Sequence, residues 1–147
     1  DFEAAAAAIL RDLPAVASVT TSPLARCRRL AERIAAARGL TLSVDPRIAE
    51  MDFGAWEGRR WDALPRAELD AWAADFRGAR PHGGESVAML EARVAAALAA
   101  AEPGPPPSLW VAHSGVARAA AALTGRATGW DTALGFGRWL DLTAPPG

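Results

Sequence analysis

Hydrophobic residues recur at helical spacing along most of this chain. Their spacing predicts five helices, over residues 2–13, 22–37, 65–76, 85–101 and 116–123. Helix-breaking residues fall where the first two segments end, with Pro14 after one and Gly39 after the other. Ser22 and Pro23 are typical of a helix start, because serine can cap the first turn and proline fits within it.

Short apolar runs between the predicted helices are typical of buried strands. We expect strands over residues 16–21, 40–44 and 109–112, and a last one could form over 139–142. Strands that alternate with helices indicate an α/β fold with a mostly parallel sheet. The 147 residues are enough for one hydrophobic core and too few for two ordinary domains, so we expect a single domain over residues 1–147.

The composition excludes several classes of function. Hydrophobic residues make up 51% and charged residues 22% of the chain, which is typical of a folded, water-soluble domain. The formal net charge of −1 provides no overall attraction to nucleic acid or to an anionic membrane. No apolar run is long enough to span a bilayer, and the first residues do not resemble a signal peptide. With a single cysteine, Cys27, the chain can form no internal disulfide or multi-cysteine metal site, so we expect a cytoplasmic protein.

Polar residues follow two of the predicted strands, at the junctions with the next helices. Ser22 and Arg26 follow one strand, and His113 and Ser114 follow another. In an open α/β sheet, ligands bind outside the carboxyl ends of the strands, where helix N-termini favour anions. Arg26 offers a planar fork of donors for phosphate oxygens, and His113 could donate to a phosphoryl group or relay a proton. By residue type alone, Arg26 could equally be a surface arginine and His113 a core histidine.

Two acidic residues lie near aromatic side chains in the loop-rich segment 45–60. Glu50 precedes Phe53, and Glu57 follows Trp56. A carboxyl group held against aromatic surface can have a raised pKa and protonate a leaving alkoxide. Residue type leaves open which of the two acids would do so, and both could simply face water in a packed loop.

Four segments carry longer patterns that can be compared with known families. Residues 22–27 read Ser-Pro-Leu-Ala-Arg-Cys, and residues 47–58 read Arg-Ile-Ala-Glu-Met-Asp-Phe-Gly-Ala-Trp-Glu-Gly. Residues 83–86 read Gly-Gly-Glu-Ser, with Arg93 on the helix that follows, and residues 110–118 read Trp-Val-Ala-His-Ser-Gly-Val-Ala-Arg. In this order the four segments resemble the motifs of the histidine phosphatases, the superfamily that includes phosphoglycerate mutase. Each motif would be a weak signal alone, but the four together are specific.

The resemblance implies a fold and a role for each motif residue. The fold would be a three-layer α/β/α domain with a mostly parallel sheet. Arg26 and His113 would bind the transferring phosphoryl group from opposite sides. Glu50 would donate the proton to the leaving oxygen, which leaves Glu57 a loop-bracing role. The resemblance also implies a small-molecule phosphate ester as substrate, no metal, no cofactor, and a monomer or homodimer.

The connection between the second and third motifs most resembles that of the α-ribazole phosphatases of cobalamin synthesis. It is short, whereas the phosphoglycerate mutases carry a longer insertion there. The resemblance therefore implies hydrolysis of α-ribazole 5′-phosphate, with a broad-specificity phosphatase or a phosphoglycerate mutase-like enzyme as the alternative. We expect substrate contacts from Ser22, Phe53, Trp61, His82 and Ser114, although ordinary core packing would also explain the two aromatic residues.

One family motif has no match in this sequence. The superfamily's nucleophile is the histidine of an Arg-His-Gly motif after the first strand, and it is phosphorylated and then hydrolysed. The two histidines of this chain, His82 and His113, fall in other motifs, so we expect a domain that lacks its N-terminal strand. Either these residues are part of a longer protein, which we favour because the sheet would otherwise lack a central strand, or the chain is a non-catalytic phosphate-binding or interaction module. A Rossmann-type nucleotide site is not expected, because no Gly-x-Gly-x-x-Gly turn is present.

Overall fold

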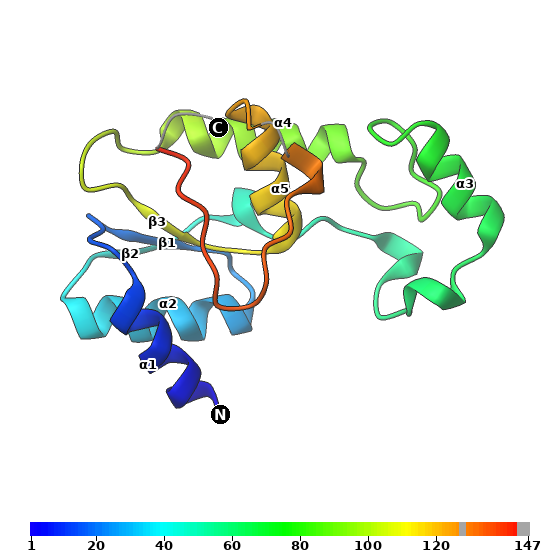
Figure 1. Ribbon diagram of the computed structural model, residues 1–147. Helices are drawn as coiled ribbons and strands as arrows, with labels where there is room; N and C mark the ends of the chain where they lie inside the picture. Colours follow the sequence, from blue (N-terminus) through cyan, green and yellow to red (C-terminus); the bar gives the residue numbers. More distant parts are fainter. Residues whose placement is uncertain (127–128, 144–147) are drawn as a thin grey trace.

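The computed structural model describes residues 1–126 and 129–143, and its sheet consists of three short parallel strands (Figure 1). The strands are β1 (Val19–Thr21), β2 (Leu42–Val44) and β3 (Leu109–Val111). Their order is β2-β1-β3, so that β1 is the central strand and pairs in parallel with both neighbours. The three strands fall within predicted segments, and their parallel pairing is the one that alternating strands and helices predict.

Helices cover both faces of this sheet. They are α1 (Phe2–Asp12), α2 (Ala25–Arg38), α3 (Arg66–Ala74), α4 (Val87–Ala100) and α5 (Ser114–Leu123). Single 3-10 turns are formed at Pro46–Ile48, Gly54–Trp56, Trp61–Ala63 and Gly129–Asp131. Figure 1 shows α1 and α2 on one face of the sheet and α4 and α5 on the other, which confirms the three-layer α/β/α arrangement. Among the helices of the described residues, none is both long enough and apolar enough to cross a lipid bilayer.

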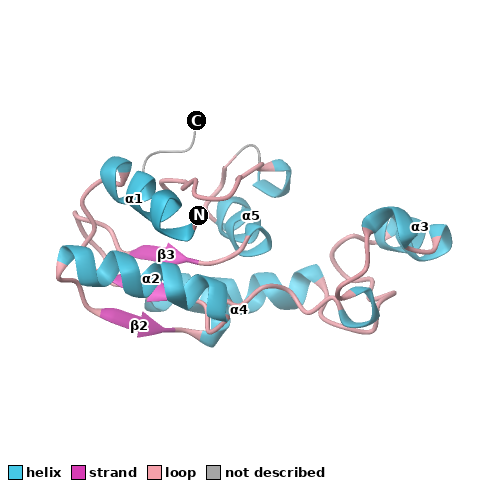
Figure 2. Ribbon diagram, turned by 90° about the horizontal axis from the view of Figure 1, so that it is seen from below, coloured by secondary structure: helices cyan, strands magenta, loops and turns pink. Residues whose placement is uncertain are grey.

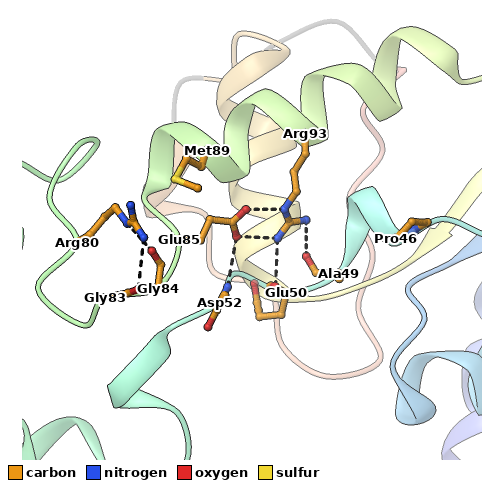
Figure 3. A pocket seen from close by; sticks show the side chains of 10 residues that line it. All are labelled: Pro46, Ala49, Glu50, Asp52, Arg80, Gly83, Gly84, Glu85, Met89 and Arg93. Atoms are coloured by element: carbon orange, nitrogen blue, oxygen red, sulfur yellow. Dashed lines mark hydrogen bonds and ion pairs between the residues drawn. The ribbon is translucent and has the colours of Figure 1, made fainter.

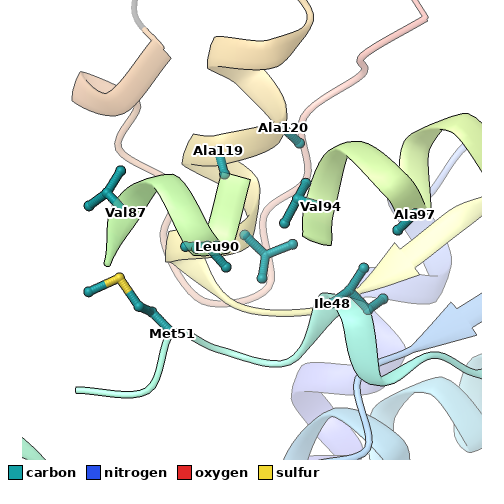
Figure 4. Packing of buried hydrophobic residues seen from close by; sticks show 9 residues of the cluster. Ile48, Met51, Val87, Leu90, Val94, Ala97, Ala119 and Ala120 are labelled. Carbon is teal, nitrogen blue, oxygen red and sulfur yellow. The ribbon is translucent and has the colours of Figure 1, made fainter. Parts of the chain in front are cut away.

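Hydrophobic side chains form two buried clusters, which lie on opposite faces of the sheet. The cluster below α2 includes Ile34 of that helix and Val19 of β1. The cluster below α4 and α5 is drawn in Figure 4. There α4 contributes Val87, Leu90 and Val94, which recur at spacings of three and four residues and so share one face of the helix. The apolar periodicity of the sequence is thus used to cover the sheet from both sides.

The helix starts at the two strand–helix junctions differ from the prediction. α2 begins at Ala25 rather than at Ser22, and Leu24 occupies its N-cap position without a side-chain hydrogen bond. The Ser22 hydroxyl accepts a hydrogen bond from the Leu24 amide at 3.2 Å, but it also reaches His113. α5 begins at Ser114, two residues earlier than predicted and directly after His113. Both differences concern residues that the sequence places at the strand–helix junctions, where a tertiary contact competes with the local helix signal.

The strand predicted over residues 139–142 is wrong. This segment runs outside the sheet, and the side chains of Trp139 and Leu140 remain exposed. The carbonyl group of Asp141 accepts a hydrogen bond from the Arg126 side chain at 3.0 Å. An apolar run forms a strand only where a neighbouring strand can satisfy its N–H and C=O groups, and sequence alone does not reveal that neighbour.

Residues 52–84, which we call the lobe, form the connection that contains α3. Figure 2 shows the lobe beyond the end of the sheet toward which the strand arrows point, which is their carboxyl end. Arg77 fastens the lobe to α4 by an ion pair with Glu91 at 3.2 Å. The ring of Phe76 packs edge-on against Trp130, with 5.3 Å between the ring centroids. The lobe is thus held near the sheet edge where α/β proteins bind ligands.

We expect Leu90→Ala to destabilise the fold strongly. The Leu90 side chain lies on the buried face of α4 and is fully buried. Its truncation removes packing contacts and leaves a cavity, so the free energy of unfolding should fall by about 2–5 kcal/mol. The adjacent Met89 is 48% exposed, and Met89→Ala is a matched control that should change this free energy by less than about 0.5 kcal/mol. Urea denaturation followed by circular dichroism measures both, and equal losses in the two variants would contradict the packing.

Candidate active site

His113 stands at the centre of a hydrogen-bonded cluster at the carboxyl ends of β1 and β3. It caps α5 directly after β3, and its side chain is buried. Its Nε2 atom lies 2.8 Å from the Ser22 hydroxyl, and its Nδ1 atom lies 3.0 Å from Arg26 Nη2. A guanidinium can only donate, so Nδ1 accepts from Arg26 and the ring proton lies on Nε2, which donates to Ser22. The pairing of β1 with β3 brings these residues together, although Ser22 and His113 are 91 residues apart in sequence.

The surroundings of His113 favour its neutral form. Burial lowers the pKa of the imidazole below its usual range, and the positive charges of Arg26 and Arg93 lower it further. The Glu50 carboxylate acts in the opposite direction and raises the pKa of His113, but by less than burial lowers it. Near neutral pH the ring is therefore an uncharged donor at Nε2 and an acceptor at Nδ1.

Cys27 packs against the same ring. Its thiol donates to the carbonyl oxygen of Ala112 at 3.4 Å, and its sulfur lies 3.5 Å from His113 Nε2. Burial raises the pKa of the Cys27 thiol, so it stays protonated and is a poor nucleophile. Sequence reasoning used Cys27 as part of a motif and as a sign of the compartment. The structure adds that it helps to hold the imidazole in place.

Glu50 lies close to the N-terminus of α5. Its Oε1 atom accepts a hydrogen bond from the Met51 amide at 2.9 Å, and its Oε2 atom accepts one from the Gly115 amide at 3.3 Å. A Cβ atom at Gly115 would collide with Oε1, so only glycine lets the carboxylate approach the helix this closely. These two hydrogen bonds orient the carboxyl group of Glu50 toward the start of α5.

Arg93 fixes the backbone that carries Glu50, and sequence reasoning identified it only as a motif residue. Its Nη1 atom donates to the carbonyl oxygens of Arg47 and Ala49, both at 2.7 Å. Its Nη2 atom donates to the Glu50 carbonyl oxygen at 3.1 Å and to Glu85 Oε1 at 2.9 Å, and Nε donates to Glu85 Oε2 at 2.7 Å. These five hydrogen bonds use every N–H of the guanidinium, so Arg93 ties the Glu50 segment to the core helix α4.

A cavity of about 360 Å³ lies beside this arrangement (Figure 3). Its wall comes from the segment 46–52, the turn 80–85, and Met89 and Arg93 of α4. Glu50 belongs to the cavity wall and also contacts the start of α5, so it lies between the cavity and the His113 cluster. Within residues 1–126 and 129–143, no group of three or more histidine, cysteine or acidic side chains is arranged to hold a metal ion.

The structure brings together some of the residues that the sequence singled out and separates others. Ser22, Arg26 and His113 form one cluster, and Glu50 reaches the same helix start. Ser114 is the first residue of α5, and its side chain is exposed.

The other predicted substrate contacts lie in the lobe. There Phe53 is half-buried and Trp61 is exposed, whereas His82 is buried, and its Nδ1 atom accepts a hydrogen bond from the Gly84 amide. Glu57 accepts a hydrogen bond from the Phe53 amide at 2.8 Å, which is the loop-bracing contact expected of it.

The chain is similar in sequence to known proteins. A family model described as "Histidine phosphatase superfamily (branch 1)" matches residues 3–140. The Probable phosphoglycerate mutase GpmB of Klebsiella pneumoniae subsp. pneumoniae is 39% identical over 88 residues, which are 57% of this chain and 40% of that protein. The protein of the same name from Salmonella paratyphi B is 38% identical over 88 residues, with the same shares of both chains. The chain therefore spans about two fifths of the length of the curated relatives it matches.

Solved structures resemble this fold over most of the chain. TTHB049 from Thermus thermophilus has a TM-score of 0.67 at 32% identity, covering 84% of this chain and 67% of that one. A structure described as phosphoglycerate mutase from the same organism has a TM-score of 0.66 at the same identity and coverage. Mycobacterial hydrolase 1 has a TM-score of 0.62 at 32% identity, covering 82% of this chain and 62% of that one. Sequence and structure thus point to the same superfamily.

We expect mild acid to destabilise the fold through its two buried histidines. Burial lowers the pKa of both His82 and His113 below the usual value of about 6.5, so near that pH the unfolded chain binds protons that the folded chain does not. This contribution to stability is complete above about pH 6.5 and is lost as the pH falls through that value toward the folded-state pKa. Urea denaturation should therefore give a smaller free energy of unfolding at about pH 5.5 than at about pH 7.5.

The variant His113→Asn separates the contribution of His113 to this pH dependence from that of His82. Asparagine cannot titrate, so the loss of stability between the two pH values should be smaller in this variant than in the unchanged chain. A loss of unchanged size would mean that the folded chain does not hold His113 in its neutral form.

Proposed function

The chain belongs to the histidine phosphatase superfamily, and on that basis we propose that the protein containing it hydrolyses a small phosphate monoester through a phosphohistidine intermediate. The observation that carries the proposal is the placement of Arg26 and His113 side by side at the carboxyl ends of adjacent parallel strands. The carboxylate of Glu50 lies at the start of the helix that His113 caps. The residues proposed to bind the phosphoryl group and to donate the proton thus lie at the sheet edge that ligands use in this class of fold.

The proposed reaction has two steps. In the first, a histidine outside these 147 residues attacks phosphorus, so that an N–P bond forms as the ester P–O bond breaks. Glu50 gives its proton to the leaving alkoxide. In the second, the oxygen of a water molecule attacks phosphorus while Glu50 takes a proton from it, so that an O–P bond forms as the N–P bond breaks, and inorganic phosphate leaves with the histidine restored. Arg26 and His113 donate to the phosphoryl oxygens in both steps.

Binding of the phosphoryl group requires one rearrangement of the present cluster. Arg26 now donates to His113 Nδ1, and it would donate to phosphate oxygens instead. The His113 Nε2 proton, which now points to Ser22, is the donor available to the ester. Both groups are already positioned in the cluster, so the rearrangement exchanges hydrogen bonds without moving the strands.

We propose α-ribazole 5′-phosphate as the first substrate to assay, with α-ribazole as the product. The support is the short connection over residues 59–83, whose motifs resemble that subgroup of the superfamily. A phosphoglycerate mutase-like activity is the second candidate, because the curated relatives carry the name Probable phosphoglycerate mutase. Assays of both substrates side by side decide between the two.

A non-catalytic phosphate-binding module is the alternative from another class. It is favoured by the positions of the two histidines of this chain, since His82 is buried in the lobe and His113 is bound by Arg26. We expect the 147 residues alone to bind inorganic phosphate without turning over esters. Turnover by these residues alone would contradict a nucleophile located outside them.

We expect His113→Ala and Arg26→Ala each to remove most of the turnover of the complete protein, by about a hundredfold or more. Each change removes a donor to the phosphoryl group in the transition state. Arg28→Ala is a matched control, because Arg28 is exposed on the same helix as Arg26 and pairs only with Glu32 among the described residues. Release of inorganic phosphate measures all three, and added chelator should change none of the rates. Loss of turnover with chelator would contradict a metal-free mechanism.

We expect Gly115→Ala to lower kcat although residue 115 has no side chain of its own. The added methyl group would collide with Glu50 Oε1 and displace the proton donor, so kcat should fall at least about tenfold, in the direction of Glu50→Gln. Gly135→Ala serves as the control, because a Cβ there meets nothing closer than 3.9 Å. A rate unchanged in Gly115→Ala but reduced in Glu50→Gln would show that the carboxylate acts from another position.

A further inference from the structure

The lobe carries an unusual concentration of aromatic rings. Trp61 contacts three of them, with ring centroids 5.9 Å from Phe53, 5.8 Å from Trp56 and 5.8 Å from Trp72. The contacts with Phe53 and Trp56 are edge-on, whereas Trp61 and Trp72 are stacked with only 13° between their planes. Three ring contacts thus support the Trp61 indole.

Core packing explains the positions of Phe53, Trp56 and Trp72, but not that of Trp61. Trp56 is buried, and Phe53 and Trp72 pack against the core cluster below α4. Trp61, by contrast, leaves 55% of its surface exposed to solvent. A tryptophan that served the core would cover its large apolar surface, and a rigid exposed indole is typical of a surface that binds a ligand. Trp72 stacks against one face of the Trp61 indole, and more than half of the surface of Trp61 stays open to a ligand.

The position of the lobe connects this ring to the proposed chemistry. Phe53, which contacts Trp61, is three residues from Glu50, and three residues of chain span at most about 10 Å. The two ends of the lobe meet at the cavity that Glu50 lines, since Asp52 and Glu85 both belong to the cavity wall. Figure 2 places the lobe beyond the carboxyl ends of the strands, and His113 follows the carboxyl end of β3. The lobe and the proposed phosphate-binding pair therefore lie at the same end of the sheet, and Glu50 lies at the base of the lobe.

The groups around Trp61 do not favour a carboxylate-bearing alcohol. Arg60, next to Trp61 in sequence, pairs with Asp62 at 3.1 Å, and Arg59 donates to the carbonyl oxygen of Ala63 at 2.8 Å. The rings in contact with Trp61 are uncharged. The surface around Trp61 therefore presents aromatic rings to a ligand. The two arginines that precede Trp61 in sequence, Arg59 and Arg60, already have partners within the lobe.

From these observations we propose that the lobe is a ring-binding site, in which Trp61 stacks against a planar aromatic or heteroaromatic group on the alcohol side of the phosphate ester. The proposal rests on the proposed function, because the phosphate end of the same ester is assigned to Arg26 and His113. It deepens that function by naming the substrate class: esters whose alcohol carries a flat ring are selected over aliphatic ones of similar charge.

Two non-hydrolysable probes test this proposal by isothermal titration calorimetry. The probes are 1-naphthylmethylphosphonate, which carries a flat ring, and propylphosphonate, which does not. We expect the naphthyl probe to bind about tenfold or more tightly, the gain typical of stacking a ring on an aromatic side chain. Trp61→Leu should remove this advantage and leave the affinity for propylphosphonate unchanged. Trp61→Phe keeps a ring at this position and should restore most of the advantage.

The control variant is Trp139→Leu, which removes another exposed indole, one outside the lobe. It should leave both affinities unchanged. Equal affinity for the two phosphonates, or an advantage that survives in Trp61→Leu, overturns the ring site while the phosphate site stands. If neither phosphonate binds, the phosphate site itself is wrong, and the ring site falls with it.

Discussion

The hydrogen bonds of Arg93 are the constraint on which the other site elements depend. The residue lies on α4, whose apolar face is buried against the core, so the guanidinium has a rigid base. All five of its N–H groups are used, on three backbone carbonyl groups around Glu50 and on both oxygens of Glu85. A change in the Glu50 backbone would break several charge-assisted hydrogen bonds at once. Glu50 therefore takes its position from a core helix, although it lies in a segment of irregular structure.

The same arginine also holds the narrow neck of the lobe. Glu85, bound by Arg93, accepts a hydrogen bond from the Asp52 amide at 3.3 Å, and its own amide donates to the Asp52 carbonyl oxygen at 2.7 Å. The two chain segments pass so closely that a Cβ atom at Gly84 would collide with the Asp52 carbonyl group. One cluster thus closes the lobe at its base and orients Glu50. The base of the lobe and the Glu50 segment are thus anchored to the same arginine, and the proposed selection of one class of ester requires such an anchorage.

The residues proposed to bind the phosphoryl group are bound to each other. Arg26, which carries a permanent positive charge, donates to His113, and His113 donates to Ser22, so that the cluster satisfies its own hydrogen bonds. Burial and the nearby arginines keep the imidazole neutral, and the protonated thiol of Cys27 packs against it. In the proposed function, an arriving phosphoryl group would replace an existing partner of Arg26 and meet a cluster that is already ordered. The motif residues thus form one hydrogen-bonded cluster, and the function assigned to it rests on that site rather than on the fold alone.

The sequence by itself determined the helices, the α/β class and the residues at the strand–helix junctions, because periodicity and breakers report local preference and burial. Its motifs also indicated the superfamily, which the comparisons confirm. Only the tertiary structure decided that Ser22 turns toward His113 instead of capping α2, and that residues 139–142 find no place in the sheet. The sequence also did not reveal that Arg93 binds the backbone around Glu50 or that Cys27 packs against His113. Each depends on contacts between residues far apart in sequence, and strand order and helix packing, rather than local pattern, decide which of them meet.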